Sequence, residues 1–297
     1  MPIWMILTLC AAVAQTTRFA LQKRLAGGRL SPAGATFARF LFAAPLAVGA
    51  AAAGLAGQGL ALPPLPAAFW GFVLLGGVAQ IVATELTVAL FAMRNFTVGV
   101  AFTKTEVVQA ALFSLIVLGE KVSAGGVVAI AAGLAGMLVL ARPPEPGAPL
   151  LNRAAAYGLA AGALFGVAAV GFRGATQALP PLPFVLTALV TLAAATCLQT
   201  ALMAVWLRLR APGQIGRTLR AWRATLPVGL TGALGSFFWF AAFALQNAAY
   251  VRALGQIEIV FTLAASTLIF GETLRGRELA GVALVVASVL ILVLSLG

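Results

Sequence analysis

The second half of this 297-residue chain repeats the first half, and the repeat lies in segments apolar enough to cross a bilayer. Residues 95–140 and 247–292 align at a constant offset of 152. Within this alignment Glu106 of the first copy falls on Glu258 of the second. A duplicated membrane unit with a polar residue near the middle of the membrane is typical of transporters. The repeat therefore favours transport over catalysis.

Composition points to a lipid environment. Hydrophobic residues make up 62% of the chain and charged residues 9%, whereas about a quarter of a soluble domain is charged. The net charge of +12 comes mostly from Arg in short runs between apolar segments, which indicates membrane topology rather than a nucleic-acid surface. Cys10 and Cys197 fall in different halves, so neither a disulfide framework nor a metal cluster is expected.

Several enzyme classes are excluded because the chain has no His and no Asp, and all seven acidic residues are Glu. Zinc-protease motifs, Ser-His-Asp triads and EF-hand loops all need one of the missing residue types. None of the three lysines lies in a phosphate-binding GxxxxGK[ST] loop. We therefore expect no catalytic residues, no cofactor and no metal.

Ten segments approach the roughly 20 apolar residues that a membrane-spanning helix needs. They cover approximately residues 3–23, 32–54, 67–90, 96–118, 122–141, 153–176, 183–206, 224–246, 249–270 and 277–296. The four prolines in residues 142–152 cannot continue a helix, so this segment divides the chain. The sequence predicts an all-α polytopic membrane protein with five-helix repeats at 1–141 and 153–297, joined by a Pro-rich linker at 142–152.

Loop charges indicate how the repeats are oriented. Five helices per repeat is an odd number, so tandem copies enter the membrane in opposite directions and form an inverted pair. Basic residues gather in the first and seventh loops: Lys23, Arg24, Arg29, Arg208, Arg210, Arg217, Arg220 and Arg223. Since Lys and Arg stay in the cytoplasm, the odd-numbered loops are predicted inside and both termini outside. Residues 213–223 fit either a short amphipathic helix or a plain basic loop, and the first span is expected to be retained rather than cleaved.

A family resemblance rests on residues 35–48 (ATFARFLFAAPLAV) and on the Gly-Glu turns at 119–120 and 271–272. This pattern resembles the drug/metabolite transporter superfamily, in particular its ten-helix EamA-type branch of amino-acid and metabolite exporters. Within that branch the chain is most similar to aromatic amino acid exporters. The resemblance implies inverted repeats around a central cavity, alternating access, and export from the bacterial cytoplasm across the inner membrane.

Ionisable side chains inside the predicted spans are the main candidates for function, since a charge at the bilayer centre costs about 2.5–3.5 kcal/mol. They are Arg39, Glu85, Lys104, Glu106 and Glu258. Two positions separate Lys104 from Glu106, or about 200° around a helix, so we expect them to face opposite ways and not to neutralise each other. Glu106 and Glu258 are expected to approach a two-fold axis, with Lys104 contacting Glu85 or Glu258. The alternative is an ion-pair network that only sets helix register.

Two polar and aromatic stripes add to this picture. Gln80 and Thr84 share one face of the third span, and Trp239 and Phe243 share one face of the eighth. A zwitterion with an aromatic side chain would suit such a pairing, although the rings could instead pack internally or face lipid. The Gly-Glu turns are expected to cap helix ends.

The predicted function is therefore export of amino acids, aromatic ones favoured, or related small metabolites. The rivals are a carrier of phosphorylated metabolites or nucleotide-sugars and a membrane scaffold or sensor without transport. A buried carboxylate such as Glu106 or Glu258 is the candidate for proton coupling, because burial disfavours its charged form. The predicted partners are a small molecule, the lipid bilayer and protons, with no nucleic acid. The predicted substrate cavity comprises Gln15, Arg18, Gln80, Thr84, Glu85, Lys104, Glu106, Gln109, Phe165, Trp239, Phe243, Asn247, Gln256 and Glu258.

Overall fold

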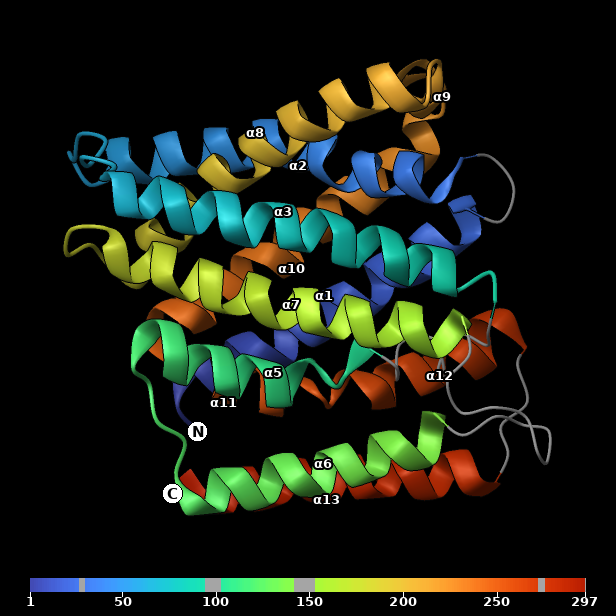
Figure 1. The fold of residues 1–297 in the computed structure, drawn as a ribbon. Helices are drawn as coiled ribbons and strands as arrows, with labels where there is room; N and C mark the ends of the chain where they lie inside the picture. Colours follow the sequence, from blue (N-terminus) through green and yellow to red (C-terminus); the bar gives the residue numbers. More distant parts are fainter. Residues whose placement is uncertain (27–29, 94–102, 142–152, 272–275, 297) are drawn as a thin grey trace.

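The computed structural model describes residues 1–26, 30–93, 103–141, 153–271 and 276–296, and every regular element in those ranges is a helix. The long helices run side by side along one direction (Figure 1). They are α1 (Ile3–Ala26), α2 (Pro32–Gly57), α3 (Ala67–Leu90), α5 (Glu106–Phe113), the π-helix η1 (Ser114–Leu118), α6 (Ala124–Ala141), α7 (Arg153–Ala178), α8 (Phe184–Arg210), α9 (Gln214–Arg220), α10 (Trp222–Leu245), α11 (Ala248–Gly255), α12 (Glu258–Phe270) and α13 (Gly276–Leu296). The predicted linker at 142–152 lies outside the described residues.

Seven stretches in the described part of the chain are long and apolar enough to cross a membrane. They are α1, α2, α3, α7, α8, α10 and the pair α11–α12. Three shorter apolar stretches, Glu106–Leu118, Ala124–Gly136 and Leu279–Leu294, lie where further spans are expected. The chain is thus a helical multi-pass membrane protein, and the count of ten spans stays a prediction.

Helix packing has the pattern expected of two similar halves. Helix α3 packs mainly on α7, and α1 packs mainly on α10. In the repeat, α1 corresponds to α7 and α3 corresponds to α10. The α3–α7 contact is therefore the counterpart of the α10–α1 contact. The remaining large interfaces, α2 with α8 and α6 with α13, each join equivalent helices. Figure 1 shows α6 and α13 as a separate antiparallel pair below the other helices.

Small residues allow these close approaches. A Cβ atom at Gly171 of α7 would lie 2.8 Å from Cα of Gly76 in α3, and one at Gly136 of α6 would lie 2.8 Å from the Gly281 carbonyl oxygen of α13. Helix backbones associate closely in lipid only where such side chains are missing. Packing of the two halves therefore depends on glycine at these positions.

The predicted caps at the Gly-Glu turns are confirmed. Gly119 ends η1 with φ of 68°, and Gly271 ends α12 with φ of 63°. Each glycine N–H bonds to the carbonyl of the residue five positions earlier, Ser114 and Ser266 respectively. Glycine adopts this left-handed conformation without the steric cost of a Cβ.

The span predicted over 249–270 is present as the apolar stretch Ala248–Phe270, but it is interrupted rather than one continuous helix. Helix α11 ends at Gly255 and α12 begins at Glu258, with Gln256 and Ile257 in a turn. The N–H groups of both turn residues bond to carbonyls three positions earlier, which tightens the backbone locally. Lys104 and Thr105, at the equivalent positions of the first half, also form a turn before α5. The two halves thus share an interruption, next to Glu106 in one and Glu258 in the other.

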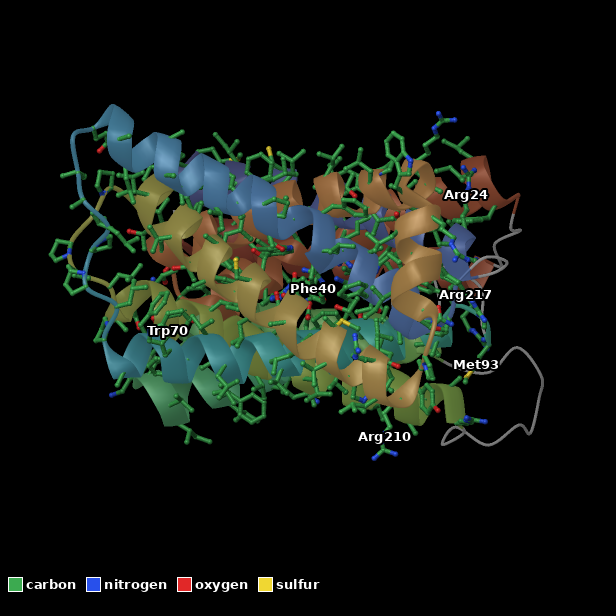
Figure 2. The ribbon with its side chains drawn as sticks, turned by 90° about the horizontal axis from the view of Figure 1, so that it is seen from above. Arg24, Phe40, Trp70, Met93, Arg210 and Arg217 are labelled. Carbon is green, nitrogen blue, oxygen red and sulfur yellow. The ribbon has the colours of Figure 1, made fainter. Side chains whose placement is uncertain are left out.

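Charge is distributed unevenly between the two ends of the molecule. The start of α1 and the end of α13 lie together at one end (Figure 1). Arg24, Arg210 and Arg217 lie at the opposite end, whereas Trp70 lies at the end with the termini (Figure 2). Residues 214–220 form helix α9 at the basic end, so this segment is a short helix rather than a plain loop. This asymmetry agrees with the predicted placement of the basic loops on one side of the membrane.

Candidate functional site

Six charged side chains are buried in the interior of the helical bundle. They come from α1, α2, the turn before α5, α5, α11 and α12, and each is 0–3% exposed: Arg18, Arg39, Lys104, Glu106, Arg252 and Glu258. Both halves of the chain contribute to this set, which we call the charged cluster. It contains four cations and two carboxylates. Exposures this low mean that solvent has little access to the cluster in this conformation.

Glu258 is one node of the cluster. Its Oε2 atom accepts a hydrogen bond from Nζ of Lys104 and another, of 2.8 Å, from Nε2 of Gln15. The Oε1 atom of Gln15 in turn accepts a 3.0 Å bond from Nε1 of Trp239. Of the two partners predicted for Lys104, the structure selects Glu258 rather than Glu85. A chain of polar contacts thus links α1, α10, α12 and the turn before α5.

Glu106 is the second node, and its contacts correct a prediction. Its Oε1 atom lies 3.8 Å from Nζ of Lys104 and 3.7 Å from Nη1 of Arg252. Lys104 and Glu106 were expected to face opposite ways on one helix. Lys104 instead lies in the turn that precedes α5, where the 100° rotation per residue of a helix does not apply. Lys104 therefore bridges the two repeat-equivalent glutamates.

Arg252 belongs to the cluster, although the sequence analysis missed it. Its guanidinium carbon lies 4.4 Å from the ring centroid of Trp239 and 5.5 Å from that of Phe243. The two rings are stacked with centroids 6.0 Å apart, so Arg252 covers the aromatic surface that was predicted to hold a substrate side chain. Arg252 lies inside the predicted span 249–270, and the search for charges within spans that identified Lys104 could have found it too.

Arg18 and Arg39 have neutral hydrogen-bond partners. Nη1 of Arg18 donates to Oε1 of Gln22 at 2.6 Å. Nη1 of Arg39 donates to Thr84 at 2.9 Å, and Nη2 donates to Ser236 at 3.1 Å. Within the described residues, no carboxylate forms an ion pair with either arginine. These two cations are therefore uncompensated by direct partners.

Three predicted cavity residues face other parts of the bundle. Gln80 accepts a 2.9 Å hydrogen bond from Gln199 of α8, which places it at the α3–α8 interface. The amide group of Gln256 lies against Gly133 of α6, close enough to contact a Cβ there. Asn247 caps α11 by accepting a 2.8 Å bond from the N–H of Ala249. The polar groups of Gln80 and Asn247 thus serve helix packing and capping, whereas Oε1 of Gln256 is buried without a hydrogen-bond partner in the described structure.

The other predicted residues make no hydrogen bond or ion pair with the cluster in the described part of the chain. Gln109 packs beside Gly166 of α7. Phe165 is buried in an apolar cluster with Phe19. Glu85 is half-buried on α3 and makes no ion pair within the described part of the chain.

At each end of the bundle, a cationic side chain joins two helical segments, and the segments joined at one end are the repeat equivalents of those joined at the other. At the end with the termini, Nε of Arg173 in α7 donates to Glu120 at 2.8 Å, and Nη1 donates to the Phe243 carbonyl. At the basic end, Nζ of Lys23 in α1 lies 4.2 Å from the ring centroid of Phe270 in α12. Helix α7 corresponds to α1, and the end of η1 corresponds to the end of α12, so these contacts occupy equivalent places at opposite ends (Figure 1).

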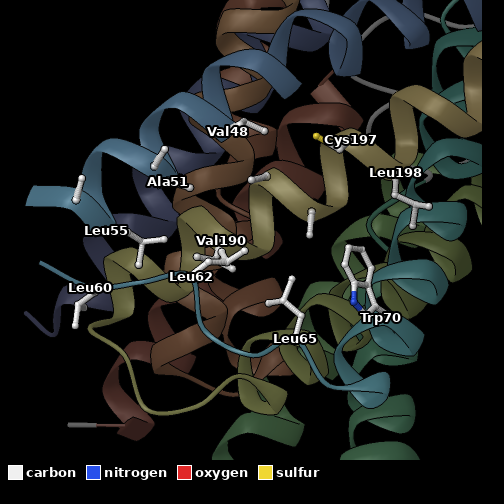
Figure 3. A pocket seen from close by; sticks show the side chains of 14 residues that line it. Val48, Ala51, Leu55, Leu60, Leu62, Leu65, Trp70, Val190, Cys197 and Leu198 are labelled. Atoms are coloured by element: carbon white, nitrogen blue, oxygen red, sulfur yellow. The ribbon is translucent and has the colours of Figure 1, made fainter. Parts of the chain in front are cut away.

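A groove of about 740 Å³ lies between α2, α3 and α8 (Figure 3). Its walls are almost entirely apolar and include Val48, Leu62, Trp70, Val190 and Cys197. Val48, Leu62 and Trp70 are also among the large hydrophobic side chains that are exposed on the surface. None of the six charged side chains lines this groove, so it is an apolar surface groove separate from the charged cluster.

Comparisons with known proteins agree with this architecture. A solved structure titled "Crystal structure of protein" is 20% identical, covers 96% of this chain and 98% of its own, and superposes with a TM-score of 0.65. A likeness at this identity shows the fold alone. No curated protein matches the chain. The EamA-like transporter family matches twice, over residues 2–142 and 152–294, which together span nearly the whole chain. The chain belongs to the EamA-like transporter family.

Proposed function

We propose that this EamA-family membrane protein is a ten-span secondary transporter that exports amino acids, aromatic ones favoured, or related small metabolites across the bacterial inner membrane. Residues 1–141 and 153–297 would form the inverted repeats that exchange access to a central site. The observation that carries the proposal is the charged cluster, which draws its members from both halves of the chain. Buried charges within a membrane segment mark substrate or ion pathways in most membrane proteins.

Alternating access is supported by the contacts at the two ends. Arg173 joins α7 to the η1–α6 turn at one end, and Lys23 joins α1 to α12 at the other. Releasing either contact would open the bundle on that side only, while the equivalent contact holds the opposite side. The turns at 104–105 and 256–257 lie beside the cluster, where a change in backbone angle would move Glu106 and Glu258 with little disturbance of the outer helices.

The side chains of the cluster favour a zwitterionic substrate. A carboxylate on the substrate would meet cations, and an ammonium group would meet Glu106 or Glu258. Trp239 and Phe243 would offer rings beside both once Arg252, which covers them in this conformation, moves away. Transfer of any of these groups from water requires compensating partners in the site. A scaffold or sensor without transport has no need of such a mixed polar centre.

The excess of cations keeps a second candidate open. Four buried cations face two carboxylates, and a phosphorylated metabolite or nucleotide-sugar would also compensate them. Glu106 and Glu258 both accept contacts from Lys104, so they repel an anionic substrate less than free carboxylates would. Direct transport measurements separate the two candidates.

The test is efflux of labelled phenylalanine and threonine from proteoliposomes that contain the purified protein. We expect phenylalanine to leave faster than threonine and faster than from protein-free liposomes. Glu258→Gln should slow this efflux, whereas Arg210→Gln, an exposed charge change outside the cluster, should not. If neither amino acid leaves faster than from empty liposomes, the amino-acid proposal is wrong and phosphorylated metabolites are tested next.

Proton coupling is tested in the same vesicles. Glu258 or Glu106 would carry the proton, because each could exchange its cationic partner for a proton during the cycle. We expect efflux to accelerate when a pH gradient is imposed across the membrane. Equal rates with and without the gradient would leave facilitated diffusion as the mode of transport.

A further inference from the structure

We propose that Arg18 and Arg39 form a binding subsite for a carboxylate group of the substrate. The inference rests on the proposed transport function, since it assigns a chemical class to the same central site. Both arginines are 2% exposed and lie on α1 and α2 of the first half. They are distinct from the ion-pair network of Lys104, Glu106, Arg252 and Glu258.

Charge balance is the first argument. Lys104 contacts both glutamates and Arg252 contacts Glu106, so two cations compensate two carboxylates. Arg18 and Arg39 remain, bonded to an amide oxygen and to two hydroxyl groups. Each guanidinium also lies over a ring, Phe19 for Arg18 and Phe40 for Arg39. A buried charge held only by neutral groups is unfavourable unless an opposite charge is supplied. An anionic ligand is the partner missing from this pair.

The position of the two side chains is the second argument. A Cβ atom at Gly232 of α10 would lie 2.9 Å from Cγ of Arg39 and 3.4 Å from Cδ of Arg18. Both arginines therefore pass over the same glycine, from two different helices. The missing side chain at Gly232 lets the stems of the two arginines lie next to each other instead of being separated by it.

The free donors are the third argument. Within the described structure, Nη2 of Arg18 and Nε of Arg39 are buried and have no hydrogen-bond partner. Two N–H donors from two guanidinium groups match the two oxygens of a carboxylate, which accepts such charge-assisted bonds strongly. A phosphate group, with three acceptor oxygens, would need further donors. The two free donors of this arginine pair thus favour a carboxylate; Nε of Arg252, the other buried guanidinium donor without a partner in the described structure, belongs to the side chain that pairs with Glu106.

Thermal stability of the purified full-length protein provides the test. The probes are phenylalanine, phenylpyruvate, phenylalaninamide and inorganic phosphate, added to wild type and to the variants Arg18→Gln, Arg39→Gln and Arg210→Gln. We expect saturable stabilisation by the two carboxylates and none by the amide. Arg18→Gln and Arg39→Gln should each weaken apparent carboxylate affinity about tenfold or more, while Arg210→Gln should bind as wild type does.

A purely structural role gives a different result. If Arg39 only held α2 to Thr84 and Ser236, Arg39→Gln would lower the melting temperature of the empty protein. A carboxylate subsite predicts that the empty variant melts no lower than wild type, because an uncompensated charge has been removed. If Arg39→Gln fails to fold, the decision passes to Arg18→Gln. Wild-type carboxylate affinity in Arg18→Gln would then overturn the proposal, and a loss of about tenfold or more would support it.

Failure of this inference can be told from failure of the proposed function. If phenylpyruvate binds through Arg39 but phenylalanine neither binds nor leaves proteoliposomes, the subsite stands and the amino-acid assignment falls. If phenylalanine and phenylalaninamide bind equally well, or both Gln variants keep wild-type affinity, the subsite is wrong although transport can still hold. Saturable binding of phosphate alone also overturns the carboxylate assignment.

Discussion

Substitution of Glu258 by Gln should destabilise the protein much more than substitution of its partner Lys104 by Met. The charged cluster holds four cations and two carboxylates. Glu258→Gln leaves four cations against one carboxylate, whereas Lys104→Met leaves three against two. The first change increases the uncompensated buried charge and the second reduces it, although both break the same ion pair.

The magnitudes follow from the contacts. Glu258 loses charge-assisted bonds from Lys104 and Gln15, and breaking a buried pair in this way costs about 3–5 kcal/mol of unfolding free energy. Lys104→Met leaves Glu258 bonded to Gln15. The loss of unfolding free energy should therefore be smaller, about 1–3 kcal/mol, as for one unsatisfied buried acceptor. The double variant should resemble Lys104→Met rather than the sum of the two single variants.

Reversible unfolding in mixed micelles, followed by far-ultraviolet circular dichroism, would measure these free energies. Arg210→Gln serves as the matched control, since it changes one exposed charge and should stay within about 0.5 kcal/mol of wild type. Equal costs for the two single variants, or a larger cost for Lys104→Met, would refute the reasoning from excess positive charge.

Three further predictions concern packing, the end contacts and the arginine pair. Gly171→Ala should lower the unfolding free energy by about 1–3 kcal/mol in the same assay, because its Cβ would lie 2.8 Å from the Gly76 backbone. Gly49→Ala, in open space on α2, should be neutral or stabilising. Arg173→Gln removes the bonds to Glu120 and to the Phe243 carbonyl. If these bonds stabilise the closed end by about 1 kcal/mol, the rate of maleimide labelling of Ala242→Cys should rise roughly fivefold in a background without Cys10 and Cys197. Unchanged labelling would exclude this contact as a closure of that end. Gly232→Ala should slow efflux at a cost of no more than about 1–3 kcal/mol of unfolding free energy, because its Cβ would lie 2.9 Å from Cγ of Arg39 and would push Arg39 away from Arg18. Wild-type efflux would show that their close approach is not required.

Sequence reasoning predicted those features that depend on local or averaged properties. Membrane residence follows from apolar content over stretches of 20 residues, which does not depend on how helices are arranged. The caps at Gly119 and Gly271 were predictable because a turn after a helix end needs a left-handed residue, and glycine supplies it. The uneven loop charge also needs no tertiary information, only the order of spans along the chain.

Side-chain partners were much less accessible. Gln15 and Glu258 are 243 positions apart and bond at 2.8 Å, a proximity that no local pattern encodes. Gln80 and Gln256 look equally suited to a polar cavity in sequence, yet the fold places them against Gln199 and Gly133. Which face of a span meets which neighbour is set by packing of the whole bundle.

The relation between Lys104 and Glu106 shows the division most directly. By itself, the sequence determined that both charges lie in a membrane protein of repeated helical units, and that one of them has an equivalent in Glu258. Only the tertiary structure decided that a turn at 104–105 releases Lys104 from helical geometry, so that its ammonium group reaches both glutamates. Hydrophobicity is additive along a chain and can be read from it, whereas the compensation of buried charge depends on distances between segments that only the folded bundle brings together.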